Sequence, residues 1–375
     1  MISGEEYSEI VLSCDELIKA GELTQALDKF STLVFYLKEA IDQGYSDKDI
    51  LLFSAMGTHL SDLLFERGET NEVIKIADLG ITLCDKAEVL QEPTCVSIGA
   101  GVLRMQRNVT MKLIATMSET ESNLLQAQLE RATIALQYYD NLYENPIFKL
   151  DSSLLDILEH LAGTATIALH LKDHKQISNL LKTLLYPYVR HEKDIDLFTQ
   201  AEIEALLALL VVYAKVLSFT AISQIDDEDS LLATATLFTV RTANQCLELI
   251  QPENKLLALN YFSQIFEIMT QLEMTHVDHA LHFQILVIFQ NLSNIIEPFS
   301  DQELYYTSIV HLSNAIINTT GIKAKTRNDA NKYLNIPLAL SYHTVLFKYI
   351  SNKNKSHKQA FAHLIAQQTL LENHK

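Results

Sequence analysis

The densest group of side chains that could bind a metal ion contains three histidines. His276, His279 and His282 are spaced three residues apart, so each is a neighbour of the next on a helix. Successive steps of three rotate around the helix axis, and the three rings therefore do not converge on one point. No cysteine and no ligand from a second helix is identifiable for them. The pattern favours a polar turn and helix start over a zinc site.

Two further groups of polar residues lack part of the pattern that a metal site needs. His170 and His174 have the i, i+4 spacing of zinc-binding helices, but they straddle a predicted turn and lack the metalloprotease glutamate. The acidic run 226–229 lacks the glycine of a calcium loop, and acids there favour the start of the next helix. The sequence also has no phosphate-binding glycine loop and no nucleophile elbow. We therefore expect no metal, no cofactor and no catalytic activity.

The elements that must position any site are helices, because the sequence marks helix ends at regular intervals. Prolines, which cannot continue a helix, occur at Pro93, Pro146, Pro187, Pro252, Pro298 and Pro337. Polar turns alternate with at least the first five prolines, near Gly68, Ser118, Asp173, Asp226 and Thr275. The ten glycines are too few for the turns of a sheet protein. The alternation predicts repeated helix hairpins.

The first hairpin carries a recognisable pattern of small and aromatic residues. Gly21 ends the first helix, since glycine tolerates the left-handed backbone of a helix end. Ala26 is small enough for the second helix to approach the first, and Phe30 follows on the same face. The segment 20–30 thereby resembles a tetratricopeptide repeat, a family that places a glycine and an acid at its turn, followed by small and aromatic residues.

The second hairpin repeats this arrangement, with Gly68 at the turn and Ala77 at the small position. The resemblance covers residues 7–41 and 50–84, and later hairpins agree with it only in rhythm. It implies an all-α fold, a right-handed superhelix or α-solenoid of about seven antiparallel hairpins. The turns are about 50 residues apart, so each helix is predicted to hold about 20 residues, longer than in the family. An all-α globular bundle is the alternative.

Charge is distributed unevenly along the chain. The formal net charge is −18, and residues 321–375 carry +7, which leaves −25 for residues 1–320. We expect a helical repeat array over 1–320 and a basic helical cap over 321–375. The cap offers a candidate basic contact surface made of Lys323, Lys325, Arg327, Lys353, Lys355 and Lys358. It could dock on the acidic body, contact an acidic partner, or bind nucleic acid or anionic lipid, although the acidic body disfavours nucleic acid.

The start of the chain and its cysteines indicate a cytoplasmic protein. The first residues are acidic where a secretion signal would be basic. The four cysteines show no CxxC spacing and are interpreted as reduced core thiols. The apolar segment 205–222 contains Lys215 and is expected to be a central helix of the array and not a membrane span.

Together these features favour a non-catalytic scaffold or adaptor for protein–protein interaction. Hairpin arrays form a concave groove that binds a peptide or a partner helix. One alternative is a peptide-responsive sensor or regulator that acts through another protein. A second alternative is a helical metalloenzyme that uses the three histidines named first.

Overall fold

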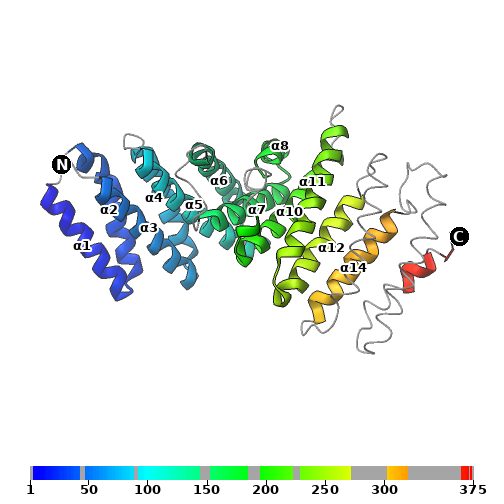
Figure 1. The fold of residues 1–375 in the computed structure, drawn as a ribbon. Helices are drawn as coiled ribbons and strands as arrows, with labels where there is room; N and C mark the ends of the chain where they lie inside the picture. The colour runs from blue at the N-terminus through cyan, green and yellow to red at the C-terminus, as the bar shows by residue number, and fades with distance from the viewer. Residues whose placement is uncertain are drawn as a thin grey trace. The chain divides into compact units, whose positions relative to one another are not determined.

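The described part of the protein is entirely helical apart from turns. The computed structural model describes residues 3–42, 47–87, 92–143, 153–184, 195–222, 229–271, 302–319, 365–370 and 372–373. These ranges contain no strand, and the all-α prediction is confirmed. The chain groups into two compact units, residues 1–176 and 177–375 (Figure 1). The boundary that we predicted at residue 320 lies outside the described residues.

Unit 1, residues 1–176, is a succession of hairpins. Its helices are α1 (Gly4–Ala20), α2 (Leu23–Asp42), α3 (Asp47–Arg67), α4 (Thr70–Ala87), α5 (Glu92–Ala115), α6 (Ser122–Tyr143), α7 (Ser153–Leu171) and the start of α8 (His174–Thr183). The helices α1 to α7 hold 17 to 24 residues, in agreement with the predicted length of about 20. The turns expected near Gly21, Gly68, Ser118 and Asp173 each lie between two consecutive helices.

Consecutive helices from α1 to α7 pack against one another, and further contacts join α1 to α3, α3 to α5, α5 to α7 and α2 to α4. The helix α5, for example, contacts α4 and α6 as well as α3 and α7. Figure 1 shows these helices side by side. We call α1, α3, α5 and α7 the A-helices, because each begins a hairpin, and α2, α4 and α6 the B-helices. The A-helices of unit 1 form one layer and the B-helices a second.

Small residues allow the helices of the first two hairpins to approach closely. Ala26 is fully buried, and its carbonyl oxygen accepts a hydrogen bond from the Cys14 thiol at 3.4 Å. Phe30 is 0% exposed and faces Gly57 of α3, where an added Cβ would lie 2.3 Å from the ring Cζ. The absence of a side chain at Gly57 therefore makes room for the Phe30 ring.

Unit 2, residues 177–375, continues the alternation of long helices. It holds the end of α8, the 3-10 turn η1 (Ile195–Leu197), α10 (Gln200–Ile222), α11 (Asp229–Leu249), η2 (Pro252–Asn254), α12 (Lys255–Gln271) and α14 (Gln302–Thr319). The helix α12 packs against α10, α11 and α14. By this pattern α10, α12 and α14 take the place of A-helices within unit 2. The expected turns at Asp226 and Thr275 and the proline at Pro298 all lie outside the described residues, although Asp226 falls in the interval between the end of α10 and the start of α11.

One described helix is long and apolar enough to cross a membrane by length and composition. This segment of α7, Leu154–Leu171, is 61% buried inside the protein, as the core helix of a soluble protein would be. The apolar segment 205–222 lies in α10, where Lys215 is exposed.

Candidate functional site

The turn glycines adopt the backbone that the sequence predicted and also receive a basic side chain. Gly21 has φ 77° and Gly68 has φ 79°, both left-handed, and the Gly21 amide donates to the Ile18 carbonyl. The Arg67 guanidinium, at the end of α3, donates to the Gly21 carbonyl at 2.9 Å. Lys112, near the end of α5, places its Nζ 3.2 Å from where a Gly68 Cβ would be. In both cases a cation meets the negative end of the preceding A-helix.

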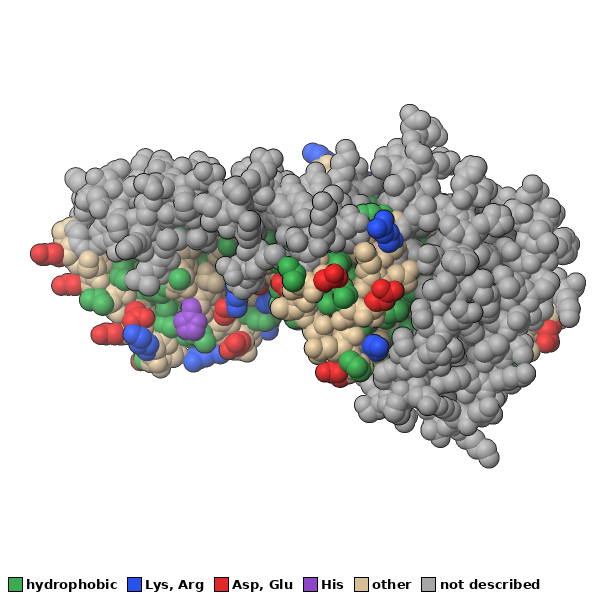
Figure 2. Space-filling view, in the orientation of Figure 1, with side chains coloured by type: hydrophobic (Ala, Val, Ile, Leu, Met, Phe, Trp, Pro, Cys, Tyr) green, Lys and Arg blue, Asp and Glu red, His purple; other side chains and the backbone are tan. Residues whose placement is uncertain are grey.

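Ion pairs connect consecutive B-helices, and in each pair the later helix supplies the cation and the earlier helix the carboxylate. Lys75 of α4 lies 3.0 Å from the carboxylate of Asp28 on α2, measured from Nζ to Oδ1. Arg131 of α6 lies 2.7 Å from Asp78 of α4, measured from Nε to Oδ1. Among the described side chains that are coloured in Figure 2, acidic and basic groups are interspersed. Exposed pairs of this kind each contribute less than about 1 kcal/mol and mainly set orientation.

The A-helices of unit 1 are connected by a larger group of charged side chains. Arg104 of α5 binds the carboxylate of Asp62 on α3 with two nitrogens, at 3.1 Å from Nε and 2.9 Å from Nη2. The Asn108 carboxamide donates to the same carboxylate at 2.9 Å and to the Ser61 hydroxyl at 3.1 Å. This bidentate arrangement fixes α5 against α3.

A second arginine connects α5 to α7. Arg107 forms an ion pair with Glu159 of α7. Its guanidinium carbon also lies 5.7 Å from the centroid of the Phe65 ring on α3, within the range of a cation–π contact. Arg107 therefore bridges three successive A-helices.

Asp156 of α7 is the remaining carboxylate of this group, and it is poorly compensated. Only 9% of the residue is exposed, and its nearest cation is Arg104 Nη1 at 3.8 Å. Burial raises the pKa of Asp156 to about 6, while Arg104 and Arg107 lower it and Glu159 and Asp62 raise it further. We call Asp62, Arg104, Arg107, Asp156 and Glu159 the A-layer cluster. It contains three carboxylates and two guanidinium groups.

Behind this cluster lies a fully buried network of uncharged polar side chains. The Gln106 carboxamide of α5 donates to the Ala77 carbonyl of α4 at 3.0 Å. Gln128 of α6 donates to Gln106 Oε1 at 3.0 Å and to the Thr110 hydroxyl at 3.3 Å. The three side chains are essentially inaccessible, so the network sets the register of three helices and is closed to a ligand.

The one histidine buried among the described residues lies on α7, one turn after Asp156. His160 Nε2 is 3.3 Å from the Ala132 carbonyl of α6, and Nδ1 has no hydrogen-bond partner. Burial lowers the pKa of His160 to about 4. The ring is therefore neutral at pH 7 and donates its Nε2 proton to Ala132.

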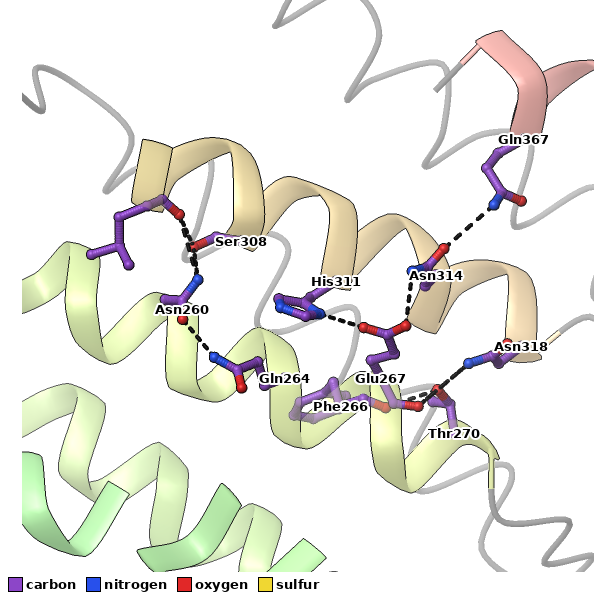
Figure 3. Close-up of polar contacts among 11 residues, drawn as sticks. Asn260, Gln264, Phe266, Glu267, Thr270, Ser308, His311, Asn314, Asn318 and Gln367 are labelled. Carbon is purple, nitrogen blue, oxygen red and sulfur yellow. Dashed lines mark hydrogen bonds and ion pairs between the residues drawn. The ribbon is translucent and has the colours of Figure 1, made fainter. Parts of the chain in front are cut away.

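In unit 2, a polar ladder runs between α12 and α14. Figure 3 shows side chains of the two helices pointing toward one another. The Asn260 carboxamide of α12 donates to the Ser308 hydroxyl of α14 at 3.2 Å, and Gln264 donates to Asn260 Oδ1 at 2.6 Å. These contacts form the first step of the ladder.

Glu267 occupies the centre of the ladder. Its carboxylate pairs with His311 Nδ1 and accepts a hydrogen bond from Asn314 Nδ2 at 2.8 Å. Farther along, Asn318 Nδ2 lies 3.4 Å from the Thr270 hydroxyl. Polar contacts therefore recur along the described seam between α12 and α14, as they do between the A-helices joined by the A-layer cluster in unit 1.

Side-chain links between helices of one layer join residues at similar distances in sequence. The separations run from 42 residues, between Arg104 and Asp62, to 53 residues, between Gln367 of the helical segment 365–370 and Asn314. Other links of both units fall between these limits. One such step corresponds to one hairpin of about 50 residues.

The residues singled out from the sequence divide into two groups. The described ones are Gly21, Ala26, Phe30, Gly68 and Ala77, and they occupy hairpin turns or buried helix faces. His276, His279, His282 and the candidate basic surface (Lys323, Lys325, Arg327, Lys353, Lys355 and Lys358) lie outside the described residues. Within the described residues, no group of three His, Cys, Asp or Glu side chains could hold a metal. His170 and His174 are exposed, on either side of the turn at Lys172.

The A-layer cluster was missed by sequence reasoning. Its signal was the placement of Arg104 and Arg107 three residues apart on one predicted A-helix, with Asp156 and Glu159 three apart on the next. Residues at this spacing share a helix face, so facing pairs of opposite charge could have been sought between successive hairpins.

Comparison with known proteins gives no relative from which a function could be transferred. No family model matches the sequence, and no match is found among curated proteins.

Proposed function

We propose that this protein is a non-catalytic scaffold or adaptor for protein–protein interaction. In this proposal the hairpins form a tetratricopeptide-like right-handed superhelix, and the A-helices line a concave groove that binds a peptide or partner helix. The observation that carries the proposal is the recurrence of same-layer links at 42 to 53 residues in both units. A stack of hairpins related by one repeated step produces such a recurrence, because each hairpin contacts only its neighbours.

The chemistry of the A-layer suits peptide binding. A peptide main chain offers amide donors and carbonyl acceptors, which exposed charged side chains can meet. Arg104 keeps 41% of its side chain exposed while it binds Asp62, so it can contact a second molecule without losing its place in the cluster.

The described cysteines fit a binding protein better than a thiol enzyme. Cys14 and Cys246 are free and buried. Burial raises the pKa of the Cys14 thiol to about 11 and that of Cys246 to about 12, so neither supplies a thiolate at neutral pH. Reduced thiols in the core also accord with the cytoplasmic location that we propose.

The groove is tested by comparing charge-matched variants of the two layers. The full chain is used as bait for affinity purification and mass spectrometry, beside Arg104→Ala/Arg107→Ala in the A-layer and Lys75→Ala/Arg131→Ala in the B-layer. We expect one set of proteins to be captured by the wild type and by the B-layer variant. The A-layer variant, which has lost both cations of the cluster, should capture a different set. Equal capture by all three, with both variants folded by circular dichroism, would overturn the groove assignment.

The superhelix is tested by small-angle scattering of the full chain. A compact globular protein of this length has a radius of gyration of roughly 21 Å. An open superhelix is expected to exceed that value clearly. A measured radius at the compact value would favour the globular bundle.

A further inference from the structure

The A-layer cluster contains one carboxylate more than its cations neutralise. Arg104 makes its hydrogen bonds to Asp62, and Arg107 is paired with Glu159. The Asp156 carboxylate is left with Arg104 Nη1 at 3.8 Å, and no hydrogen bond to it is found within the described residues. A carboxylate that is 9% exposed ordinarily accepts several hydrogen bonds, because burial without them is costly. Asp156 therefore has room for a further donor.

The surroundings of Asp156 favour a cationic donor. From α5 it is faced by Arg104 and Arg107, from α3 by Asp62, and from α7 by Glu159, which gives the cluster a net charge of −1. Burial raises the pKa of Asp156 to about 6, and a second cation beside it would return that pKa toward its ordinary value.

The other helix packed against α7 supplies no competing cation. On α6, Arg131 is engaged with Asp78 of α4, and Glu130 is exposed. Unit 1 as a whole holds 28 acidic and 14 basic residues, a net charge of −14, which attracts a basic partner and repels an acidic one.

We propose that the A-layer face of α3, α5 and α7 docks a lysine- or arginine-containing peptide, one cationic side chain of which binds the Asp156 carboxylate. The proposal rests on the function proposed above and names the chemistry of the partner. The bound ammonium or guanidinium group donates to the oxygens that Arg104 leaves free, and it brings the net charge of the cluster to zero. Arg104 and Glu159 remain in place on either side.

The test uses a fluorescein-labelled twelve-residue peptide that repeats Gly-Ser-Lys, with counterparts that carry Gln or Glu in place of Lys. Binding to the full chain is measured by fluorescence anisotropy at pH 7 and at pH 5. Because any acidic protein attracts such a probe, Asp156→Asn is compared with Glu130→Gln, which removes the same charge from the exposed surface of α6. Asp156→Glu keeps the charge and guards against a fold defect in the first variant.

We expect the Lys peptide to bind more tightly than its counterparts. Asp156→Asn should weaken the affinity for the Lys peptide about tenfold. Glu130→Gln should weaken that affinity less than about twofold, and Asp156→Glu should retain binding of the Lys peptide. The affinity of the wild type should fall between pH 7 and pH 5, and that of Asp156→Asn should change less. Equal weakening by Asp156→Asn and Glu130→Gln would overturn the proposal, since only general attraction would then be present.

The two proposals fail in different ways. If the partners captured by the wild type depend on Arg104 and Arg107 but persist with Asp156→Asn, the cationic site is wrong and the groove stands. If the chain captures no protein and binds no peptide of any charge, the proposed scaffold function itself is wrong.

Discussion

A methyl group added at Gly57 tests how closely the first two hairpins approach. In a Gly57→Ala variant, the new carbon would lie 2.3 Å from Cζ and 2.8 Å from Cε2 of Phe30. Non-bonded carbon atoms rest about 3.5–4.0 Å apart, so the ring would have to move by about 1 Å or more. Phe30 is 0% exposed, and because protein cores are close-packed, the ring can move only by displacing its neighbours.

The expected cost follows from two opposing effects. Overpacking of a core costs about 1–3 kcal/mol, and the size of this clash places Gly57→Ala at the upper end. Alanine is favoured over glycine inside a helix by about 1 kcal/mol. The net destabilisation is therefore about 2 kcal/mol, which corresponds to roughly 4–8 °C in the unfolding transition of unit 1.

A second variant separates the clash from other effects. Phe30→Leu alone should cost about 1–2 kcal/mol, because it leaves a small cavity. In that background Gly57→Ala should cost almost nothing, which gives a coupling energy of about 2 kcal/mol in thermal and urea unfolding followed by circular dichroism.

Gly80→Ala serves as the matched control. Its Cβ would lie 2.7 Å from Met105 Sδ, a flexible thioether that can shift, so the change should stay within about 1 kcal/mol. Additive costs of Gly57→Ala and Phe30→Leu, or a Gly57→Ala variant as stable as the wild type, would refute the close approach.

Three further predictions concern the turns, the buried histidine and the polar ladder. Gly21→Ala and Gly68→Ala should each cost about 1–2 kcal/mol in urea unfolding, because both positions have a left-handed backbone. The pKa of His160 is lowered to about 4, so the contribution of its neutral ring to stability is present above about pH 6.5 and is lost as the pH falls toward 4. His160→Leu should therefore reduce the difference in melting temperature between pH 7 and pH 4.5. An unchanged difference would contradict the assignment of a buried, neutral ring. Glu267→Gln should cost about 1–3 kcal/mol, because it removes the carboxylate that pairs with His311, while Glu253→Gln at an exposed site should cost little.

The positions of the hairpin turns could be predicted from the sequence because local chemistry determines them. Gly21 and Gly68 end helices because glycine readily adopts the left-handed backbone of a helix end. Tertiary contacts stabilise these ends further but do not determine where they fall. The turn near Ser118 has no glycine, yet it falls between α5 and α6 as the spacing required. The regular spacing of turns and prolines was sufficient to place the helices, since a helix of about 20 residues gives a long and regular sequence pattern.

The contacts between hairpins could not be predicted, because they depend on the rotation of each helix about its axis. Arg104 reaches back 42 residues to Asp62, and Arg107 reaches forward 52 residues to Glu159. A shift of one residue in helix phase turns a side chain by about 100°, which is enough to exchange these partners. Gly57 is a second contact that could not be predicted. From the sequence alone, a glycine inside a helix indicates only a lower helix propensity, whereas the structure shows that this glycine packs against the Phe30 ring.

Polar seams between A-helices give each interface a defined register. Apolar side chains alone tolerate sliding of one helix along another, because leucine contacts leucine equally well one turn away. The Arg104–Asp62 and Glu267–His311 pairs do not, since a shift of one turn would leave partly buried charged groups unpaired. In the superhelix that we propose, no single closed core fixes every helix at once. Each interface must then be specified by its own hydrogen bonds, and in both units such bonds lie between successive A-helices.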